Sequence, residues 1–223
     1  MSRTDEQREQ KKQLRLRQEE ERVEKLCEFE KQYPDCELIC GVDEVGRGPL
    51  AGPVVAGAVI LPKGVRILHI NDSKKLTEKR RNELFEVIDK MAVRWSVASA
   101  SPKRIDEINI LQADYEAMRK AIRRLGVTPD LILADAVTIP KINIRQTGII
   151  HGDALVQSIA AASIMAKVTR DRYMTAVDKL YPEYSFASNK GYGTAAHIAA
   201  LKKYGPCPIH RMTFIGKFIG EHD

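Results

Sequence analysis

The sequence predicts an α/β fold in which helices flank a mixed sheet, and three observations support this prediction. Apolar runs rich in β-branched residues occur three times in succession within the first 100 residues. Helix-like and strand-like segments alternate after them. No repeat of 20–50 residues is visible, which excludes a solenoid or propeller. At 223 residues, the chain suits one domain, or one domain with a short appendage.

Three strands open the predicted sheet. Each is a run of mostly apolar residues, and Pro62 and Gly64 close the second run. Because the connections between these runs are short, we expect the three strands to be antiparallel neighbours. They are predicted over residues 38–44, 51–61 and 92–100.

The rest of the predicted domain alternates helices with short strands. The first of these helices ends at Gly126, and a long helix with a face of small residues is stopped by Pro182. The helices are predicted over residues 105–125, 153–180, 194–203 and 211–219, and the strands over residues 131–134 and 148–150.

Residues 1–35 form a charged helical extension in this interpretation, ahead of a main domain over residues 36–223. The extension holds nine Lys or Arg and ten Asp or Glu residues, and pairs such as Glu21–Lys25 favour a helix. We expect this helix to be solvated and too polar to pack firmly. Pro34 breaks it, and no sustained apolar heptad indicates a coiled coil.

The composition indicates a basic protein without disulfides or membrane spans. The net charge is +6, of which residues 1–35 contribute −1 and residues 36–223 contribute +7, and this basic body favours a polyanionic partner. The four cysteines lack zinc-site spacing, so we expect reduced thiols. The charged N-terminus and the lack of an 18-residue apolar run predict a cytoplasmic protein that makes no membrane contact.

Four acidic residues stand where an acid is costly. Asp43 and Glu44 end the first apolar strand, Asp135 follows the strand over 131–134, and Asp153 opens the long helix. Buried carboxylates without partners become protonated, so several of them at strand ends are best explained by a divalent metal. Taken singly, Asp153 could be a helix cap and Asp135 a loop acid.

This oxygen-rich donor set predicts Mg²⁺ or Mn²⁺, with two ions in one site. A carboxylate cluster on a basic protein fits two-metal hydrolysis of phosphodiesters. One difficulty is geometric, because neighbouring residues of a strand point to opposite faces. Asp43 and Glu44 can therefore converge only if the strand ends or kinks there, which Gly46 and Gly48 would allow.

Five sequence motifs resemble those of the ribonuclease HII family, in the family's order and at its spacing. The resemblance covers about residues 38–215. The motifs are GVDEVGRGPLAGP at 41–53, DSKKL at 72–76, HGD at 151–153, SIAAASIMAKVTRD at 158–171 and NKGYGT at 189–194.

The resemblance implies a ribonuclease H-like fold with a five-stranded mixed sheet. It implies Asp43, Glu44, Asp135 and Asp153 as the catalytic and metal-binding residues. The implied reaction is hydrolysis of the RNA strand of RNA–DNA hybrids and nicking on the 5′ side of single ribonucleotides embedded in duplex DNA, which leaves a 3′-hydroxyl and a 5′-phosphate. The expected partner is therefore nucleic acid, and a monomer is expected.

The resemblance also assigns substrate reading to Gly46, Arg47, Gly48 and Tyr192. Glycines let backbone groups approach a sugar–phosphate closely, and Arg47 could grip the neighbouring phosphate. The 2′-hydroxyl separates RNA from DNA, and Tyr192 could stack on the sugar that follows the ribonucleotide. Out of context, Gly-Arg-Gly is a tight turn. Further phosphate contacts are predicted for Lys74, Lys75, Lys167, Arg170 and Lys190.

Three alternatives stay open at this point. Ribonuclease HIII would carry an extra N-terminal domain, for which residues 1–35 are too short. An integrase or resolvase would not need the Tyr192 segment or Gly-Arg-Gly. A non-catalytic module that binds RNA–DNA hybrids would be expected to have lost one of the four acids. The chain also departs from many family members at Leu155-Val156 and at Asn189, which puts phosphate contacts from residues 155 and 156 in doubt.

Overall fold

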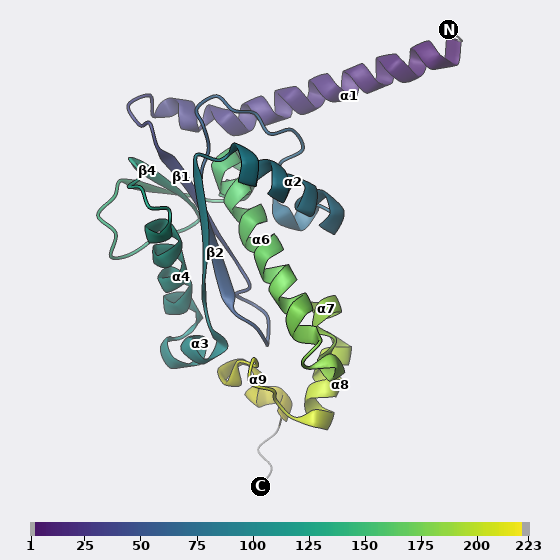
Figure 1. Ribbon diagram of the computed structural model, residues 1–223, viewed down its shortest axis with the longest axis vertical. Helices are drawn as coiled ribbons and strands as arrows, with labels where there is room; N and C mark the ends of the chain where they lie inside the picture. Colours follow the sequence, from purple (N-terminus) through teal and green to yellow (C-terminus); the bar gives the residue numbers. More distant parts are fainter. Residues whose placement is uncertain (1–2, 220–223) are drawn as a thin grey trace.

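The computed structural model describes residues 3–219 and contains a five-stranded mixed sheet flanked by helices (Figure 1). The strand order is β3-β2-β1-β4-β5. The first three strands pair antiparallel, whereas β1–β4 and β4–β5 are parallel pairs. The predicted fold class is therefore confirmed. The strands are β1 (Ile39–Val45), β2 (Val54–Ile60), β3 (Arg94–Ala100), β4 (Leu131–Asp135) and β5 (Gln146–Ile149).

The connection between β2 and β3 is longer than the sequence suggested, because it contains the helix α2 (Glu78–Met91). Thr77 caps this helix by accepting a hydrogen bond from the Arg80 amide. Only Leu84 and Ile88 of α2 are buried, so a weak apolar pattern hid the helix in the sequence. The strands that it joins are nevertheless antiparallel neighbours, as predicted.

One helix covers each face of the sheet. The helix α4 (Ile110–Arg124) packs on one face through Ala117 and Met118, against side chains of β1 and β2 such as Val42 and Ala58. The helix α6 (Gln157–Asp178) runs along the other face, and both helices lie beside β1 and β2 in Figure 1. This arrangement buries apolar side chains on both sides of the central strands.

Two predicted helices are each divided in two. The expected helix over 105–125 consists of α3 (Pro102–Ile108) and α4, which Asn109 separates with a φ of 67° while its side chain caps the second helix. The expected helix over 153–180 consists of α5 (Gly152–Leu155) and α6, with extended backbone at Val156. A local backbone change of one residue leaves no mark on helical periodicity.

Glycines on the sheet let α6 approach β1 and β2 closely. A Cβ atom at Gly41 would lie 2.1 Å from the carbonyl carbon of Ser158. A Cβ atom at Gly57 would lie 2.4 Å from the carbonyl oxygen of Ala162. The small-residue face of α6 that the sequence displays is therefore the face that contacts the sheet, and its position fixes the side chains of α6 near the end of β1.

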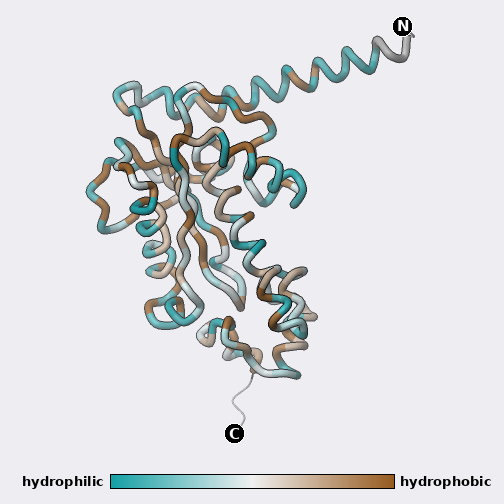
Figure 2. Tube along the Cα trace, in the orientation of Figure 1, coloured by the Kyte–Doolittle hydropathy of each residue, from teal (hydrophilic) through white to brown (hydrophobic). Residues whose placement is uncertain are grey.

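The N-terminal helix α1 (Arg3–Glu28) projects from the body for most of its length, and Figure 2 shows that most of its residues are hydrophilic. Its last turns pack firmly, contrary to the prediction. Val23 and Leu26 are buried, and Arg22 donates a 2.6 Å hydrogen bond to the Ile70 carbonyl. A domain boundary at residues 35 and 36 stays a prediction, and residues 1, 2 and 220–223 of the predicted units lie outside the described residues.

The C-terminal region of the structure contains short helices below the sheet in Figure 1. Within residues 3–219, no helix is both long and apolar enough to cross a membrane. The remaining helices are α7 (Phe186–Asn189), α8 (Ala195–Tyr204) and α9 (Met212–Ile219), with 3-10 turns η1 (Glu30–Gln32), η2 (Ser73–Lys75) and η3 (Pro182–Tyr184).

Candidate active site

Two of the predicted acids lie at the carboxyl ends of neighbouring parallel strands. Val42 of β1 pairs with Ala134 of β4, so Asp43 and Asp135 follow these paired residues at the same edge of the sheet. The strand β4 ends at Asp135, whereas β1 continues to Val45. The last residues of β1, which follow Asp43, therefore have no partner strand on the side of β4.

The strand β1 does not end or kink at the acid pair, so that expectation was wrong. Asp43 and Glu44 remain paired in register with Gly57 and Ala56 of β2. Alternation then places the two side chains on opposite faces of the sheet. Asp43 lies on the face of α6, and Glu44 lies on the face of α4. Because β4 has ended, both carboxylates border the same open edge.

The third strand end contributes Asp153. Strand β5 pairs with β4 up to Ile149 opposite Asp135, and His151 then turns the chain in a left-handed conformation with a φ of 58°. The Gly152 amide at the start of α5 donates a 2.7 Å hydrogen bond to Asp135 Oδ1. This turn brings the helix that carries Asp153 to the end of β4, so elements far apart in the sequence bring their acids to one edge.

The acids influence each other's ionisation. Burial raises the pKa of Asp43 well above its ordinary value, and the charges of Glu44 and Asp135 add to the rise, while the Ser163 hydroxyl opposes it. Burial also raises the pKa of Glu44 and of Asp153. Carboxylates placed this close favour protonation unless a cation compensates their charge.

The donor set fits a divalent metal. All four predicted ligands offer carboxylate oxygen, which is the preferred donor for Mg²⁺ and Mn²⁺. Three of them, Asp43, Glu44 and Asp153, have pKa values raised by burial and so are sites where a bound cation would replace protons. Within residues 3–219, no three His, Cys, Asp or Glu side chains are already grouped to hold one ion.

Lys74 is the predicted phosphate ligand nearest to the acids. Burial alone would lower its pKa, but the charges of Asp43 and Asp153 raise it. The turn η2 holds Lys74 in place, because Asp72 Oδ1 accepts a 2.9 Å hydrogen bond from its amide. The next residue, Lys75, is exposed. The structure therefore places Lys74 beside the acid cluster and Lys75 at the surface of the same turn.

The turn η2 is connected to the acid cluster through two serines. Ser73 and Ser163 share a 2.8 Å hydrogen bond between their hydroxyl oxygens, and both side chains are buried. Ser163 also lies beside the Asp43 carboxylate, whose pKa it lowers. This chain of contacts joins the DSKKL segment, α6 and β1.

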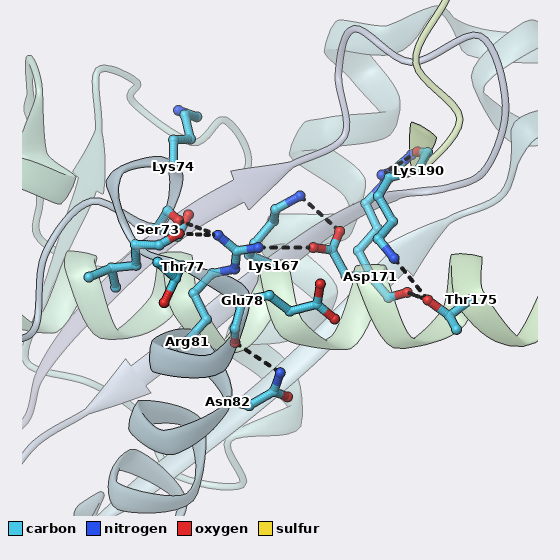
Figure 3. Close-up of polar contacts among 12 residues, drawn as sticks. Ser73, Lys74, Thr77, Glu78, Arg81, Asn82, Lys167, Asp171, Thr175 and Lys190 are labelled. Atoms are coloured by element: carbon cyan, nitrogen blue, oxygen red, sulfur yellow. Dashed lines mark hydrogen bonds and ion pairs between the residues drawn. The ribbon is translucent and has the colours of Figure 1, made fainter. Parts of the chain in front are cut away.

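Lys167 on α6 and Lys190, which follows α7, already have partners within the protein (Figure 3). Lys167 donates a 2.8 Å hydrogen bond to Asp171, which also forms an ion pair with Arg81. Lys190 donates hydrogen bonds to the Thr175 hydroxyl and the Ala187 carbonyl. Both lysines would have to exchange these contacts to bind a phosphate.

The structure contradicts the predicted phosphate contact of Arg170. Its side chain is fully buried, and its guanidinium donates to the carbonyl oxygens of Pro53, Ala51 and Lys190 at 2.9, 3.2 and 2.9 Å. A guanidinium that is enclosed in this way cannot reach a phosphate in solvent. Arg170 instead holds the chain after the Gly-Arg-Gly segment against the segment that precedes Tyr192.

A second buried arginine holds the Gly-Arg-Gly segment itself. Arg211 has no exposed surface, and it donates hydrogen bonds to the carbonyls of Gly46, Arg47 and Gly52 at 2.5, 2.8 and 3.0 Å. Gly46 has a φ of 92°, and a Cβ atom there would lie 2.3 Å from Arg170 Nε. The loop therefore depends on glycine and on donors from the far end of the chain.

The structure brings Tyr192 next to the Gly-Arg-Gly loop. The Leu50 amide donates a 2.8 Å hydrogen bond to the Gly191 carbonyl. A Cβ atom at Gly48 would lie 4.0 Å from the Tyr192 ring, which is 44% exposed. The residues predicted from two distant motifs thus form one surface.

A buried histidine pair fixes the Tyr192 segment. His197 Nδ1 lies 2.8 Å from the Tyr192 carbonyl, and the Nε2 atoms of His197 and His210 are 3.0 Å apart. His210 Nδ1 accepts a hydrogen bond from the Cys207 amide, so its Nε2 carries the proton given to His197. These assignments follow from the hydrogen-bond pattern and require both rings to be neutral.

We expect the histidine pair to make stability depend on pH. Burial, followed by the charge of His197, lowers the pKa of His210 to about 4. Below pH ~6.5 the unfolded chain takes up a proton that the folded chain does not, so stability falls as the pH falls from 6.5 towards 4, by about 2 kcal/mol between pH 7 and pH 5. Urea unfolding at pH 7 and pH 5 measures this loss.

The variant His210→Asn should show a smaller loss between the two pH values, because it removes the titrating ring. Its matched control is His69→Asn, since His69 is exposed. Equal slopes for the wild type and His210→Asn would contradict the assignment.

Sequence reasoning missed two buried residues beside the site, Arg211 and Asp114. Asp114 lies on α4, and burial, followed by the charge of Glu44, raises its pKa to about 8, against the influence of Arg47. One signal was present in the sequence. Asp114 stands three and four residues before Ala117 and Met118, which places an acid on the apolar face of the helix.

Comparison with known proteins identifies the family. The family model for ribonuclease HII matches residues 40–217. The chain belongs to the ribonuclease HII family. Ribonuclease HII from Lachnoclostridium phytofermentans is 62% identical to it over 201 residues, which cover 90% of this chain and 79% of that protein.

Solved structures agree with this family. Ribonuclease H2 from Pyrococcus horikoshii OT3 has a TM-score of 0.66 at 29% identity, over 82% of this chain and 95% of that one. Bst-RNase HIII in complex with Mn²⁺ has a TM-score of 0.55 at 17% identity, over 75% of this chain and 63% of that one. The second likeness concerns the fold alone.

As a member of the ribonuclease HII family, the chain is a metal-dependent endonuclease of the ribonuclease H class. The predicted enzyme class is confirmed, and nucleic acid is its substrate. Family membership favours this enzyme over the hybrid-binding module, ribonuclease HIII and the integrase that the sequence left open. The roles of individual site residues stay predictions.

Proposed function

We propose that the enzyme hydrolyses the RNA strand of RNA–DNA hybrids and nicks duplex DNA on the 5′ side of single embedded ribonucleotides. The products are a 3′-hydroxyl and a 5′-phosphate, and the acting form is a monomer. The observation that carries the proposal is the convergence of Asp43, Glu44, Asp135 and Asp153 at one sheet edge, together with a Gly-Arg-Gly loop that contacts Tyr192.

The four acids are proposed to hold two Mg²⁺ or Mn²⁺ ions. Bound there, the metals would supply an activated water and stabilise the leaving oxygen. The chain's own part is to orient the carboxylates, and the bound metals would keep them ionised. Asp135 is oriented by the Gly152 amide and Asp43 by the Glu44 amide, each through a hydrogen bond to Oδ1. Lys74 adds positive charge beside them.

Recognition of the ribonucleotide is proposed for the loop of Gly46, Arg47 and Gly48 with Tyr192. The glycines let backbone groups reach the 2′-hydroxyl, which distinguishes RNA from DNA. Arg47 is 45% exposed and can bind the neighbouring phosphate. Tyr192, with its exposed ring beside Gly48, would stack on the following sugar and favour deoxyribose there.

Phosphates further along the duplex are proposed to contact Lys74 and Lys75, with Lys167 and Lys190 as additional contacts after they release their present partners. The basic charge of the body supports such a polyanionic partner.

The proposal is tested with a DNA duplex that contains one ribonucleotide. We expect a nick on its 5′ side with Mg²⁺ or Mn²⁺ and none in EDTA. The variant Tyr192→Ala should reduce this nicking about tenfold relative to cleavage of an all-RNA strand in a hybrid, because only the single ribonucleotide presents a junction to deoxyribose. Tyr204→Ala is the matched control, since Tyr204 is also exposed but lies on α8.

Cleavage confined to longer RNA tracts would keep the nuclease but refute the junction reading. An equal loss on both substrates for Tyr192→Ala would refute the assignment of Tyr192. No cleavage with either metal, while the duplex stays bound, would refute the catalytic proposal.

A further inference from the structure

Asp114 is a buried acid in an apolar surrounding that no step above uses. It has no exposed surface and lies on α4 between Ala113 and the packed residues Ala117 and Met118. Neither of its carboxylate oxygens has a hydrogen-bond partner among the described residues. A buried acid in such a position is destabilising unless a cation compensates it, whereas an apolar residue there would carry no such penalty.

The cation beside Asp114 is Arg47. Arg47 Nε lies 3.7 Å from Asp114 Oδ2, and Arg47 Nη1 lies 3.5 Å from Glu44 Oε1. Among the described residues, no other ion pair of Asp114 occurs. The guanidinium of Arg47 therefore lies between two acids, one on α4 and one at the end of β1.

The two acids differ in what they can do for Arg47. Glu44 borders the open edge and is a proposed metal ligand, so its charge is shared once a metal binds. Asp114 is enclosed by the helix and the sheet, so in its ionised form its charge acts on Arg47 alone among the cations of the described residues. A guanidinium that is held at its Nε edge still offers Nη2 to a phosphate, and it offers Nη1 as well once Glu44 binds a metal, which allows a bidentate contact.

We propose that Asp114 is a positioning residue that anchors Arg47 at its Nε edge and presents the rest of the guanidinium to the phosphate beside the ribonucleotide. This inference rests on the proposed function, because it needs Arg47 to bind that phosphate. Asp114 touches neither substrate nor metal in this scheme. Gly46 and Gly48, on either side of Arg47, have no side chains that could hold the guanidinium in place. Asp114 therefore supplies this support from α4.

A double-mutant cycle tests the proposal. The variants are Asp114→Asn, Arg47→Ala and the double variant. The binding of a labelled duplex with one ribonucleotide is measured at pH 9, where Asp114 is ionised, and in EDTA, where no cleavage occurs. We expect each single variant to weaken binding about tenfold. In the Arg47→Ala background, Asp114→Asn should have no further effect. With Mg²⁺, Asp114→Asn should raise KM and leave kcat within about twofold.

The matched control is Glu116→Gln on the same helix. Glu116 forms ion pairs with Arg104 and Lys120, away from Arg47, and its neutralisation should leave binding unchanged. The thermal midpoint of Asp114→Asn should not fall, because the change removes a buried charge. A normal midpoint separates weak binding from a damaged fold.

Each other result overturns the proposal in a recognisable way. If Arg47→Ala binds normally, the phosphate contact of the proposed function fails, and the role of Asp114 fails with it. If Arg47→Ala weakens binding but Asp114→Asn does not, or if the two effects add, only the role of Asp114 fails. If Asp114→Asn binds normally in EDTA but needs more Mg²⁺ for half-maximal cleavage, Asp114 acts on the metal instead.

Discussion

Replacement of Asp135 by Asn should lower the rate of cleavage of an RNA–DNA hybrid about 10³-fold or more, while binding of the hybrid persists. The substitution removes the charge that a metal needs and keeps the shape of the side chain. The Asn carbonyl oxygen can still accept the hydrogen bond that the Gly152 amide donates at 2.7 Å, so the start of α5 should stay in place. Initial cleavage rates with saturating Mg²⁺, beside binding measured in EDTA, separate the two effects.

The matched control for this variant is Asp130→Asn, at the other end of β4. Asp130 accepts hydrogen bonds from the Glu37 and Leu38 amides, so it is structural and distant from the sheet edge of the acids. Its cleavage rate should be close to that of the wild type. Cleavage by Asp135→Asn within tenfold of the wild type would remove Asp135 from the metal-binding set.

Replacement of Gly41 by Ala should destabilise the fold by about 3 kcal/mol or more. The added Cβ atom would lie 2.1 Å from the carbonyl carbon and 2.3 Å from the carbonyl oxygen of Ser158. Both are backbone atoms, which cannot rotate away, so α6 must move from β1. Because α6 carries Ser163 beside Asp43, cleavage should fall together with stability.

Urea unfolding of Gly41→Ala measures the loss, and Gly216→Ala is its control. Gly216 lies in α9 with nothing within 4 Å of the added Cβ atom. Since alanine favours helix over glycine, Gly216→Ala should be neutral or stabilising by up to about 1 kcal/mol. An unchanged unfolding midpoint for Gly41→Ala would show that α6 can shift without cost.

The fold could be predicted largely from the order of apolar runs, and the departures share one cause. The predicted strands agree with the structure to within a few residues, because a buried strand consists of a recognisable run of apolar residues. The helix α2 buries only Leu84 and Ile88, so its sequence carries little of that pattern. Asn109 and Val156 interrupt helices by their backbone angles, which periodicity does not register.

The site divides in the same way. Asp43, Glu44, Asp135 and Asp153 stand out because acids at the ends of apolar runs are unexpected, and the structure brings them to one edge. Arg170 was misread as a phosphate ligand, since a basic residue in a family motif gives no indication of its burial. Local sequence could not reveal the partners of Arg211 or Asp114 either.

The contacts of Arg211 also constrain when the enzyme can become competent during its synthesis. Its three hydrogen bonds go to the carbonyls of Gly52, Arg47 and Gly46, which precede it in the chain by 159, 164 and 165 residues. A nascent chain therefore contains the whole Gly-Arg-Gly loop long before the donors that complete it have been translated. Contacts of such long range form late in folding, because closing them costs the most chain entropy. The proposed reading of a ribonucleotide therefore requires a chain that has been translated through Arg211, because the loop lacks these three donors until then.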